Sequence, residues 1–470
     1  MHSSRMAHFM MKPQIPPSPA NNTPEVWRGS IRDPGIGRVT REQSDGRPGA
    51  INPLTVTLSL GSQSCQMAVA ARLQREGALR RVLAFPAGVE IFDPDGADGL
   101  KLIRRYRRYR LVNRLICAAW NRLPGSSRAR NMPIVASTAY ADWLASRWVP
   151  PATIFHGWTG NCFACIKKAR QYGSIIMIEQ ATMHPNEWQD AVLKECETFG
   201  IRPRDCRANL PALLIRRMER EFEMADAILV PSLVARGSFE RAGYRERTMV
   251  VNAGVDHHFF SSPAKSAPGD IFRVCFAGRV ELLKGLPYLL RAWNQLGLTQ
   301  AELVLIGEVA PEMNRIIKQW APSNVRFLGF LPPSELADWY RSSHLFVFPS
   351  VNEGLARVIF EAMSCGLPVV ATELSGAEDC ITQGIEGNVV PARNVEALAE
   401  AILWHYSYPE ASAAMGSAAR SRIERQFTLP HYVERVVGVY RGAADKLAGA
   451  VSTYPNCSDA ASSASTSDLV

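Results

Sequence analysis

The stretch that decides the fold is FVFPSVNEGLARVIFEAMSCGLPVVAT, which runs from Phe346 to Thr372. Its first apolar run stops at Pro349, a polar loop follows, and apolar residues then recur at helical spacing until Gly366. A second apolar run begins after Pro368. The pattern predicts strand, loop, helix and strand. Such a unit places its loop at the carboxyl edge of a parallel sheet, where ligands bind.

Two carboxylates lie on this unit. Glu353 falls in the loop and Glu361 in the predicted helix, and about 1.5 Å of rise per residue separates them by about 12 Å along the axis. That distance is close to the span of a nucleoside diphosphate-sugar from its hexose to its ribose. The backbone N–H groups of Gly354 and Leu355 are expected to open the helix and to face an anion.

The Glu-x7-Glu pattern within EGLARVIFEAMSCGLPVVAT resembles the family 4 retaining glycosyltransferases, of the glycosyl transferases group 1 type, which have the GT-B fold. The resemblance implies an α/β protein with two Rossmann-like domains, parallel sheets that face a central cleft, and a C-terminal helix that returns to the N-domain. It also implies that Glu361 binds ribose hydroxyls. Glu353 would bind the sugar and favour the developing oxocarbenium ion.

A second element of the resemblance lies upstream. An apolar run ends at Gly278, where the missing side chain lets the backbone approach a ligand. Arg279 and Lys284 match the family pattern G-R-(x4)-K-G, whose two cations hold the diphosphate. A bidentate guanidinium and a point-charge ammonium suit that task. The resemblance therefore implies a donor site made of Gly278, Arg279, Lys284, Glu353, Gly354, Leu355 and Glu361.

The first half of the chain carries weaker signals. A predicted strand ends at His156, and the resemblance implies that a histidine at this place orients the donor sugar. His184, after another predicted strand, is a parallel candidate. We prefer His156, because a proline follows His184. On the resemblance, the loop at Gly61 and Ser62 lines the acceptor side of the cleft. The predicted catalytic set is therefore Glu353, His156, Arg279 and Lys284.

Composition and turn signals predict the domain organisation. The first residues are rich in Pro, Gly, Ser and Asn, and the last are rich in Ser and Ala. We expect a disordered leader over 1–50, an N-terminal Rossmann-like acceptor domain over 51–252, a C-terminal Rossmann-like nucleotide-sugar domain over 253–426, a closing helix over 427–447 and a disordered tail over 448–470.

The net charge of +9 comes from one segment, because Lys101 to Arg130 contains ten Lys and Arg residues and no acid. An apolar stripe among these cations predicts an amphipathic basic helix, which suits an anionic membrane surface. A solvated domain face and a polyanionic partner are the alternatives. Nucleic acid is not expected as a partner, because no binding motif accompanies the patch.

Other features set the expected surroundings. The ten cysteines show no framework spacing, and the single pair Cys162–Cys165 has no partner pair at zinc spacing. No apolar run reaches the length of a membrane helix, and the N-terminus lacks a signal core. We expect a cytoplasmic protein, and the basic segment favours a peripheral position at the inner face of the membrane. The D-x-D motif at Asp93 to Asp95 lies in the weakly matching half, so we expect no metal and no cofactor.

Together with these features, the resemblance implies a metal-independent retaining hexosyltransferase. It would use a nucleotide-sugar donor and a glycan or lipid-linked acceptor, in envelope or extracellular polysaccharide biosynthesis. One alternative is a nucleotide-sugar epimerase on the same fold, which would need acid and base groups near C2 of the sugar. The other is a non-catalytic adaptor that binds a membrane or a polyanion.

Overall fold

The computed structural model describes residues 54–60, 64–84, 90–95, 99–105, 132–261 and 271–452. All of them belong to one compact unit, Ile51–Val470. The predicted leader lies outside the described residues, as do Gly61 and Ser62 and most of the predicted basic helix.

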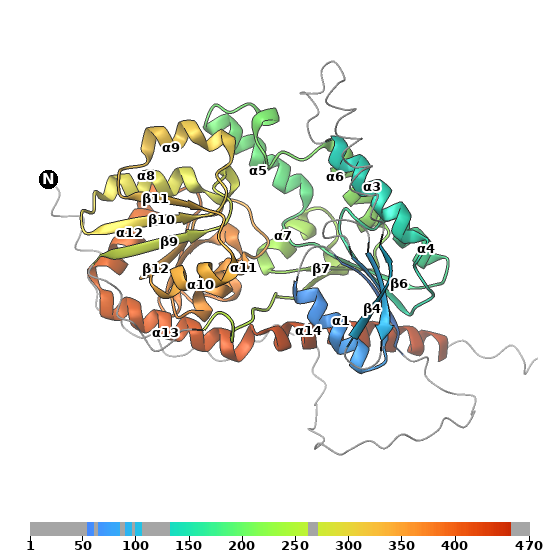
Figure 1. The fold of residues 1–470 in the computed structure, drawn as a ribbon. Helices are drawn as coiled ribbons and strands as arrows, with labels where there is room; N and C mark the ends of the chain where they lie inside the picture. Colours follow the sequence, from blue (N-terminus) through green and yellow to red (C-terminus); the bar gives the residue numbers. More distant parts are fainter. Residues whose placement is uncertain are drawn as a thin grey trace, which may run out of the picture. The chain divides into compact units, whose positions relative to one another are not determined.

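The first sheet has the strand order β4-β3-β2-β1-β5-β6-β7-β8 in the described residues (Figure 1). Its strands are β1 (Val56–Leu60), β2 (Leu79–Ala84), β3 (Glu90–Asp95), β4 (Gly99–Arg105), β5 (Ile154–Trp158), β6 (Ile175–Glu179), β7 (Ala227–Val230) and β8 (Thr248–Val250). The neighbouring strands β2, β1, β5, β6, β7 and β8 pair in parallel. The β3–β4 hairpin extends the sheet beyond β2 by antiparallel pairing. The neighbours β1 and β5 mark the point at which the strand order reverses, which is where ligands bind in such sheets.

The prediction of a basic helix is wrong for its first residues, which form a strand. Lys101 and Arg104 lie in β4, which pairs with β3. Residues 106–131, which carry most of the cations, lie outside the described residues.

The second sheet has the order β11-β10-β9-β12-β13-β14 and is parallel throughout. Its strands are β9 (Phe272–Ala277), β10 (Ala301–Ile306), β11 (Val325–Gly329), β12 (Leu345–Phe348), β13 (Val369–Thr372) and β14 (Gly387–Val390). Here the strand order reverses between β9 and β12. The predicted donor loops follow these two strands, so both loops reach the same point of the sheet edge.

Helices cover the sheets on both faces. They are α1 (Ser64–Arg75), α3 (Met132–Ser146), α4 (Phe163–Arg170), α5 (Pro185–Thr198), α6 (Ala212–Glu223), α7 (Leu233–Arg241), α8 (Leu286–Leu296), α9 (Asn314–Trp320), α10 (Pro333–Arg341), α11 (Arg357–Ser364), α12 (Val395–Ser407), α13 (Pro409–Gln426) and α14 (Leu429–Ser452). We call the first sheet with α1 to α7 the N-lobe, and the second sheet with α8 to α13 the C-lobe.

The chain returns to the N-lobe through α14, which lies beside α1 (Figure 1). Tyr432, Val436 and Tyr440 of α14 are buried in the core that β1 and α1 form. The helix runs to Ser452, beyond its predicted end at residue 447. Burial of this apolar stripe attaches the end of the chain firmly to the N-lobe.

Helix α5 links the lobes in a second way. Its residues Val192 and Cys196, with Phe199 just after it, belong to the hydrophobic core of the C-lobe. Glu195 is fully buried there and accepts hydrogen bonds from Tyr288 and Arg393. The two lobes therefore share packing on the α5 side of the cleft.

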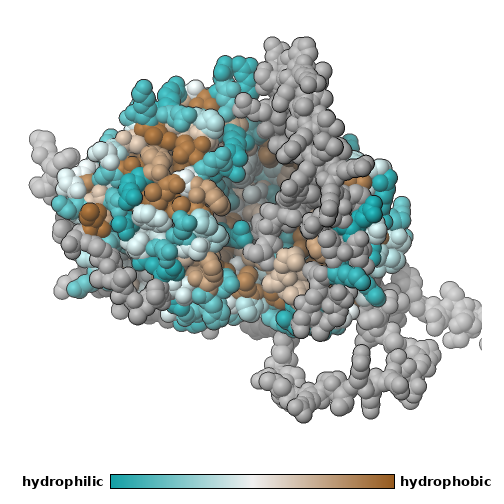
Figure 2. Space-filling view, viewed as in Figure 1, coloured by the Kyte–Doolittle hydropathy of each residue, from teal (hydrophilic) through white to brown (hydrophobic). Residues whose placement is uncertain are grey.

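No helix in the described part of the chain is long and apolar enough to cross a membrane. The cysteines in that part are buried and unpaired. Figure 2 shows apolar side chains gathered over α9 and the edge strand β11, where Phe327 and Phe330 are exposed.

Candidate functional site

The β12–α11 unit has the predicted order of strand, loop, helix and strand. Its loop is held by buried hydroxyl groups, since Ser350 Oγ donates to the Leu283 carbonyl at 2.9 Å. One detail of the prediction is wrong. The helix α11 begins at Arg357, so Gly354 and Leu355 precede it and do not open it. Glu361 consequently lies about one turn into the helix.

Two glycines let the loop after β9 approach the loop after β12. Gly278 has a φ of +138°, a conformation that favours glycine. Gly285 has a φ of +70°, and a Cβ atom there would lie 1.8 Å from the Pro349 carbonyl oxygen. Only glycine fits at this contact. The close approach brings Lys284, the residue before Gly285, to the Glu353 carboxylate.

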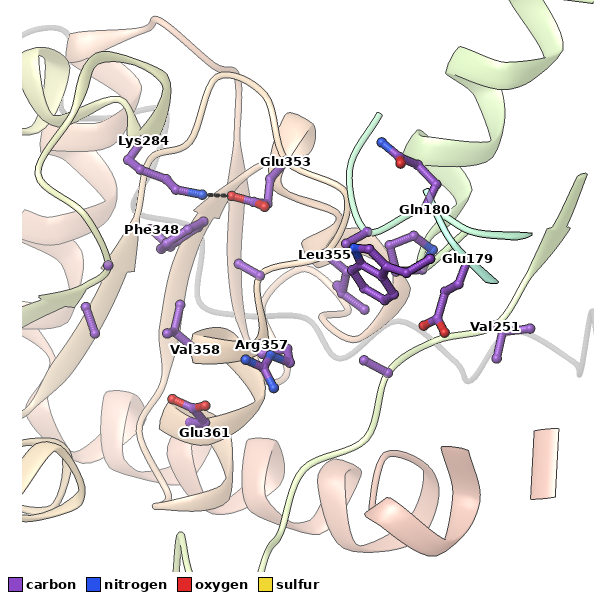
Figure 3. A pocket seen from close by; sticks show the side chains of 17 residues that line it. Glu179, Gln180, Val251, Lys284, Phe348, Glu353, Leu355, Arg357, Val358 and Glu361 are labelled. Carbon is purple, nitrogen blue, oxygen red and sulfur yellow. Dashed lines mark hydrogen bonds and ion pairs between the residues drawn. The ribbon is translucent and has the colours of Figure 1, made fainter. Parts of the chain in front are cut away.

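A cavity of about 230 Å³ opens where these loops face the N-lobe (Figure 3). We call it the cleft pocket. Of the predicted donor residues, Gly278, Lys284, Glu353, Leu355 and Glu361 line it.

The charged side chains of the cleft pocket's C-lobe wall are those of Lys284, Glu353, Arg357 and Glu361. Lys284 Nζ forms an ion pair with the Glu353 carboxylate. Burial lowers the pKa of Lys284 to about 8, so a further anion in the pocket would favour its charged form. Glu361 accepts a hydrogen bond from the Tyr340 hydroxyl at 3.4 Å, and burial raises its pKa. Arg357, which sequence reasoning missed, also lines the pocket.

Two predicted donor residues do not line the cleft pocket. Arg279 is partly exposed and forms an ion pair with Glu281 at 3.1 Å. Gly354 lies against the N-lobe, where its carbonyl oxygen accepts a hydrogen bond from Ser232 Oγ. A Cβ atom at Gly354 would lie 2.0 Å from the Ala181 carbonyl oxygen. This glycine therefore permits a direct contact between the lobes beside Glu353.

Neither candidate histidine lines the cleft pocket. The strand β5 does not end at His156 as predicted but continues to Trp158. His156 is 4% exposed, and its Nδ1 atom is hydrogen-bonded to the Tyr440 hydroxyl at 2.6 Å. His184 is the N-cap of α5 and packs against aromatic rings, including that of Phe239. The acceptor-side residues Gly61 and Ser62 lie outside the described residues.

The N-lobe wall of the cleft pocket consists of residues that sequence reasoning missed. Trp158 and Glu179 are the last residues of the paired strands β5 and β6, and Gln180 follows. Figure 3 shows Glu179 and Gln180 across the pocket from Lys284 and Glu361. The predicted strands contained the signal, because the last residue of a parallel strand lies at the ligand-binding edge.

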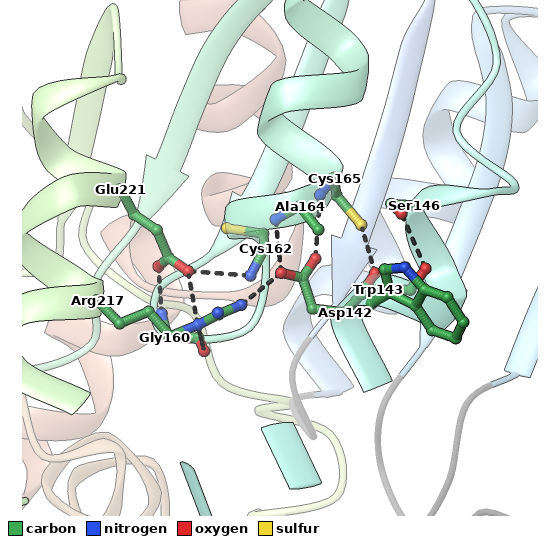
Figure 4. Close-up of polar contacts among 9 residues, drawn as sticks. All are labelled: Asp142, Trp143, Ser146, Gly160, Cys162, Ala164, Cys165, Arg217 and Glu221. Atoms are coloured by element: carbon green, nitrogen blue, oxygen red, sulfur yellow. Dashed lines mark hydrogen bonds and ion pairs between the residues drawn. The ribbon is translucent and has the colours of Figure 1, made fainter. Parts of the chain in front are cut away.

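A buried charge network supports the loop after β5 (Figure 4). Asp142 accepts hydrogen bonds from two backbone N–H groups at the start of α4, and it pairs with Arg217. Glu221 accepts hydrogen bonds from the backbone of Gly160 and Cys162. Burial raises the pKa of Glu221 to about 7. This network fixes the backbone directly after Trp158.

The thiol groups of Cys162 and Cys165 are buried against this network, and burial raises the pKa of both. A raised pKa keeps a thiol protonated and unreactive. Among the described residues, no group of three His, Cys, Asp or Glu side chains is arranged to hold a metal ion.

Solved structures share this two-lobed architecture. An α,α-trehalose-phosphate synthase (UDP-forming) from Burkholderia vietnamiensis matches with a TM-score of 0.58 at 13% identity, over 85% of this chain and 99% of that one. Anabaena Alr3699/HepE in complex with UDP matches with a TM-score of 0.53 at 16% identity, over 85% of this chain and 100% of that one. Two Rossmann-like lobes with a cleft and a returning C-terminal helix define the GT-B fold.

Sequence comparison adds the family. The family model described as "Glycosyl transferases group 1" matches residues 271–407, which include the whole C-lobe wall of the cleft pocket. This part of the chain is therefore similar to the glycosyl transferases group 1 family. The chain is 32% identical over 219 residues to D-inositol 3-phosphate glycosyltransferase 1 of Catenulispora acidiphila, which covers 42% of this chain. The match spans about half (52%) of that relative's length.

Proposed function

We propose that the protein is a retaining glycosyltransferase that moves a hexose from a nucleotide-sugar to a hydroxyl group of an acceptor. One observation carries the proposal. Lys284, Glu353 and Glu361 come from separate elements of the C-lobe and line one cavity at the point where the strand order reverses. The Glu353 and Glu361 carboxylates suit the hydroxyl groups at the two ends of a nucleotide-sugar. The Lys284 ammonium group suits the phosphates between those ends.

Each group has a proposed role. Lys284 neutralises the diphosphate, and its charge stabilises the leaving group as the sugar–phosphate bond breaks. Arg279, on the same loop, would have to leave its pair with Glu281 to assist. Glu361 accepts hydrogen bonds from the ribose hydroxyls, and Glu353 binds the sugar hydroxyls and favours positive charge at the anomeric carbon.

Retention of configuration is part of the proposal. The acceptor hydroxyl would attack the anomeric carbon from the face that the phosphate leaves. Trp158 and Gln180 of the N-lobe wall would contact the sugar. His156, which is buried and does not line the cleft pocket, would act through the residues of that wall. Its proposed role is to orient the wall and not to contact the donor directly.

The acceptor is proposed to be a glycan or a lipid-linked sugar. The C. acidiphila relative is named for transfer to an inositol phosphate, and the Rhizobium leguminosarum relative LpcC for lipopolysaccharide core biosynthesis. A membrane-bound acceptor also agrees with the cations between Lys101 and Arg130. Flotation with liposomes that contain or lack phosphatidylglycerol tests this part. Binding should require the anionic lipid and should weaken with salt.

The main proposal is tested by thermal shift with UDP, GDP and ADP, followed by a panel of the matching nucleotide-sugars. We expect one nucleoside diphosphate to raise the melting temperature, and the enzyme to release that nucleotide from one sugar of the panel. An epimerase would interconvert the sugar without nucleotide release. An adaptor would respond to no nucleotide, and either result would contradict the proposal.

A further inference from the structure

The N-lobe wall of the cleft pocket contains an ionisable group that the proposed function does not use. Glu179 ends β6, its side chain is 19% exposed, and it lines the pocket opposite Lys284 and Glu361 (Figure 3). We propose that Glu179 is a further catalytic residue, which takes the proton from the attacking acceptor hydroxyl. This inference rests on the proposed glycosyl transfer and deepens it.

Neutral groups hold the Glu179 carboxylate in place. Gln66 of α1 donates to Oε2 at 2.7 Å, and the Tyr432 hydroxyl of α14 lies 3.2 and 3.3 Å from the two oxygens. Within the described residues no Lys or Arg forms an ion pair with Glu179. The carboxylate is therefore oriented by hydrogen bonds but is not neutralised by a neighbouring cation.

His156 does not supply the missing charge. Its Nε2 atom lies 3.6 Å from Glu179 Oε2, while Nδ1 is hydrogen-bonded to Tyr440. Burial lowers the pKa of His156 to about 4, so the imidazole is neutral near pH 7. Burial also raises the pKa of Glu179, which makes its carboxylate a stronger base than an exposed glutamate.

A second cavity adjoins the cleft pocket beside Glu179 and has room for the acceptor. This cavity, of about 380 Å³, shares Trp158, Gln180 and Ala181 with the cleft pocket and extends into the N-lobe. Glu179 lines the cleft pocket, and both its register partner Trp158 on β5 and the next residue, Gln180, line the two cavities. Among the described residues, the lining of the second cavity contains no charged side chain and combines apolar groups such as Trp188 and Leu214 with polar ones such as Asn161 and Thr182, a mixture that suits a sugar.

The proton transfer balances without any further reactant. The acceptor O–H bond breaks and its proton moves to Glu179, while the oxygen forms a bond to the anomeric carbon of the donor. The bond from that carbon to the phosphate oxygen breaks, and its electron pair leaves with the nucleoside diphosphate. Glu179 then returns its proton to water, so nothing is oxidised or reduced.

The test uses the full-length protein and the nucleotide-sugar that the panel identifies, with water as the acceptor. Glu179→Gln should slow nucleotide release by about 100-fold or more, which is what the loss of a general base costs. Affinity for the nucleoside diphosphate should not change, because Glu179 lies on the N-lobe wall, across the cleft pocket from the C-lobe groups proposed to hold the diphosphate. Sodium formate should restore release in Glu179→Gly, since formate supplies the missing carboxylate.

A purely structural role makes different predictions. Tyr432→Phe removes one hydrogen bond to Glu179 and leaves the carboxylate, so it serves as the matched control. If Glu179 only anchors α14, Tyr432→Phe and Glu179→Gln should lower the melting temperature alike. Formate should then have no effect on Glu179→Gly. Either that pattern or full activity of Glu179→Gln would overturn the inference.

The two proposals fail separately. If the wild-type protein binds no nucleoside diphosphate and consumes no nucleotide-sugar, the glycosyltransferase proposal fails and the inference fails with it. If the wild-type protein is active and Glu179→Gln is equally active, only the assignment of Glu179 is wrong.

Discussion

Lys284 and Glu353 form an ion pair inside the cleft pocket, although they come from loops that follow two different strands. The contact of Gly285 with the Pro349 carbonyl brings these loops together. A diphosphate that enters the pocket competes with Glu353 for the ammonium group. Lys284 would then exchange one anion for another, and the Glu353 carboxylate would become free to bind sugar hydroxyls.

Lys284→Ala should raise the dissociation constant of the preferred nucleoside diphosphate at least about tenfold, since a charge-assisted hydrogen bond contributes about 1.5–3 kcal/mol. Isothermal titration calorimetry measures the effect. Lys318→Ala, at an exposed position on α9, is the matched control and should bind like the wild-type protein. An unchanged constant in Lys284→Ala would contradict the diphosphate role.

Glu361→Ala should abolish donor hydrolysis and transfer while the protein stays folded. The one hydrogen bond that the structure gives this side chain is the long one from Tyr340, so unfolding free energy should fall by no more than about 1.5 kcal/mol. Nucleotide release and urea unfolding measure the two effects. Glu400→Ala, on the exposed side of α12, controls for the loss of a surface carboxylate.

Gly354→Ala should separate the lobes beside the cleft pocket, because the added methyl group meets the Ala181 carbonyl. We expect a loss of about 1–3 kcal/mol in unfolding free energy and a large drop in turnover. Thermal unfolding and nucleotide release are the measurements. A Cβ at Gly438 of α14 meets no atom within 4 Å, so Gly438→Ala should leave turnover intact. Equal turnover in both variants would show that the lobe contact has no role.

The pKa of Glu221 predicts a pH dependence of stability. Its value is about 7 in the folded protein against an ordinary value of 4.5, so the folded state binds this proton more tightly than the unfolded chain does. Its contribution is therefore full below pH 4.5 and is lost as the pH rises towards about 7. Between pH 4.5 and pH 7, the unfolding free energy measured with urea should fall less in Glu221→Gln than in the wild-type protein. Identical slopes would contradict the assigned pKa.

Much of the C-lobe could be predicted from local sequence. The apolar runs, the break at Pro349 and the helical spacing around Glu361 specify strand, loop and helix without any distant contact. The glycine at 278 also has a local cause, because its positive φ restricts the residue type. These features are sufficient to predict most of one wall of the cleft pocket.

Local sequence did not predict the other wall. The side chains of a strand alternate between its two faces, and the sequence does not say where a strand stops or what covers each face. His156 and Glu179 both belong to stretches that the sequence predicts as strand ends. In the structure His156 contacts Tyr440, while Glu179 lines the cleft pocket. Helix α14, from the far end of the chain, contacts both side chains, but Glu179 is the last residue of its strand and His156 lies two residues before the end of β5.

The sequence by itself determined the α/β character, the donor loops of the C-lobe and the family resemblance, because each depends on residues close together in the chain. Only the tertiary structure decided that Lys101 and Arg104 join a strand, that His156 is buried and that Glu179 faces the donor loops. Those outcomes depend on strand pairing and helix docking between segments far apart in the chain, and no local pattern records such contacts.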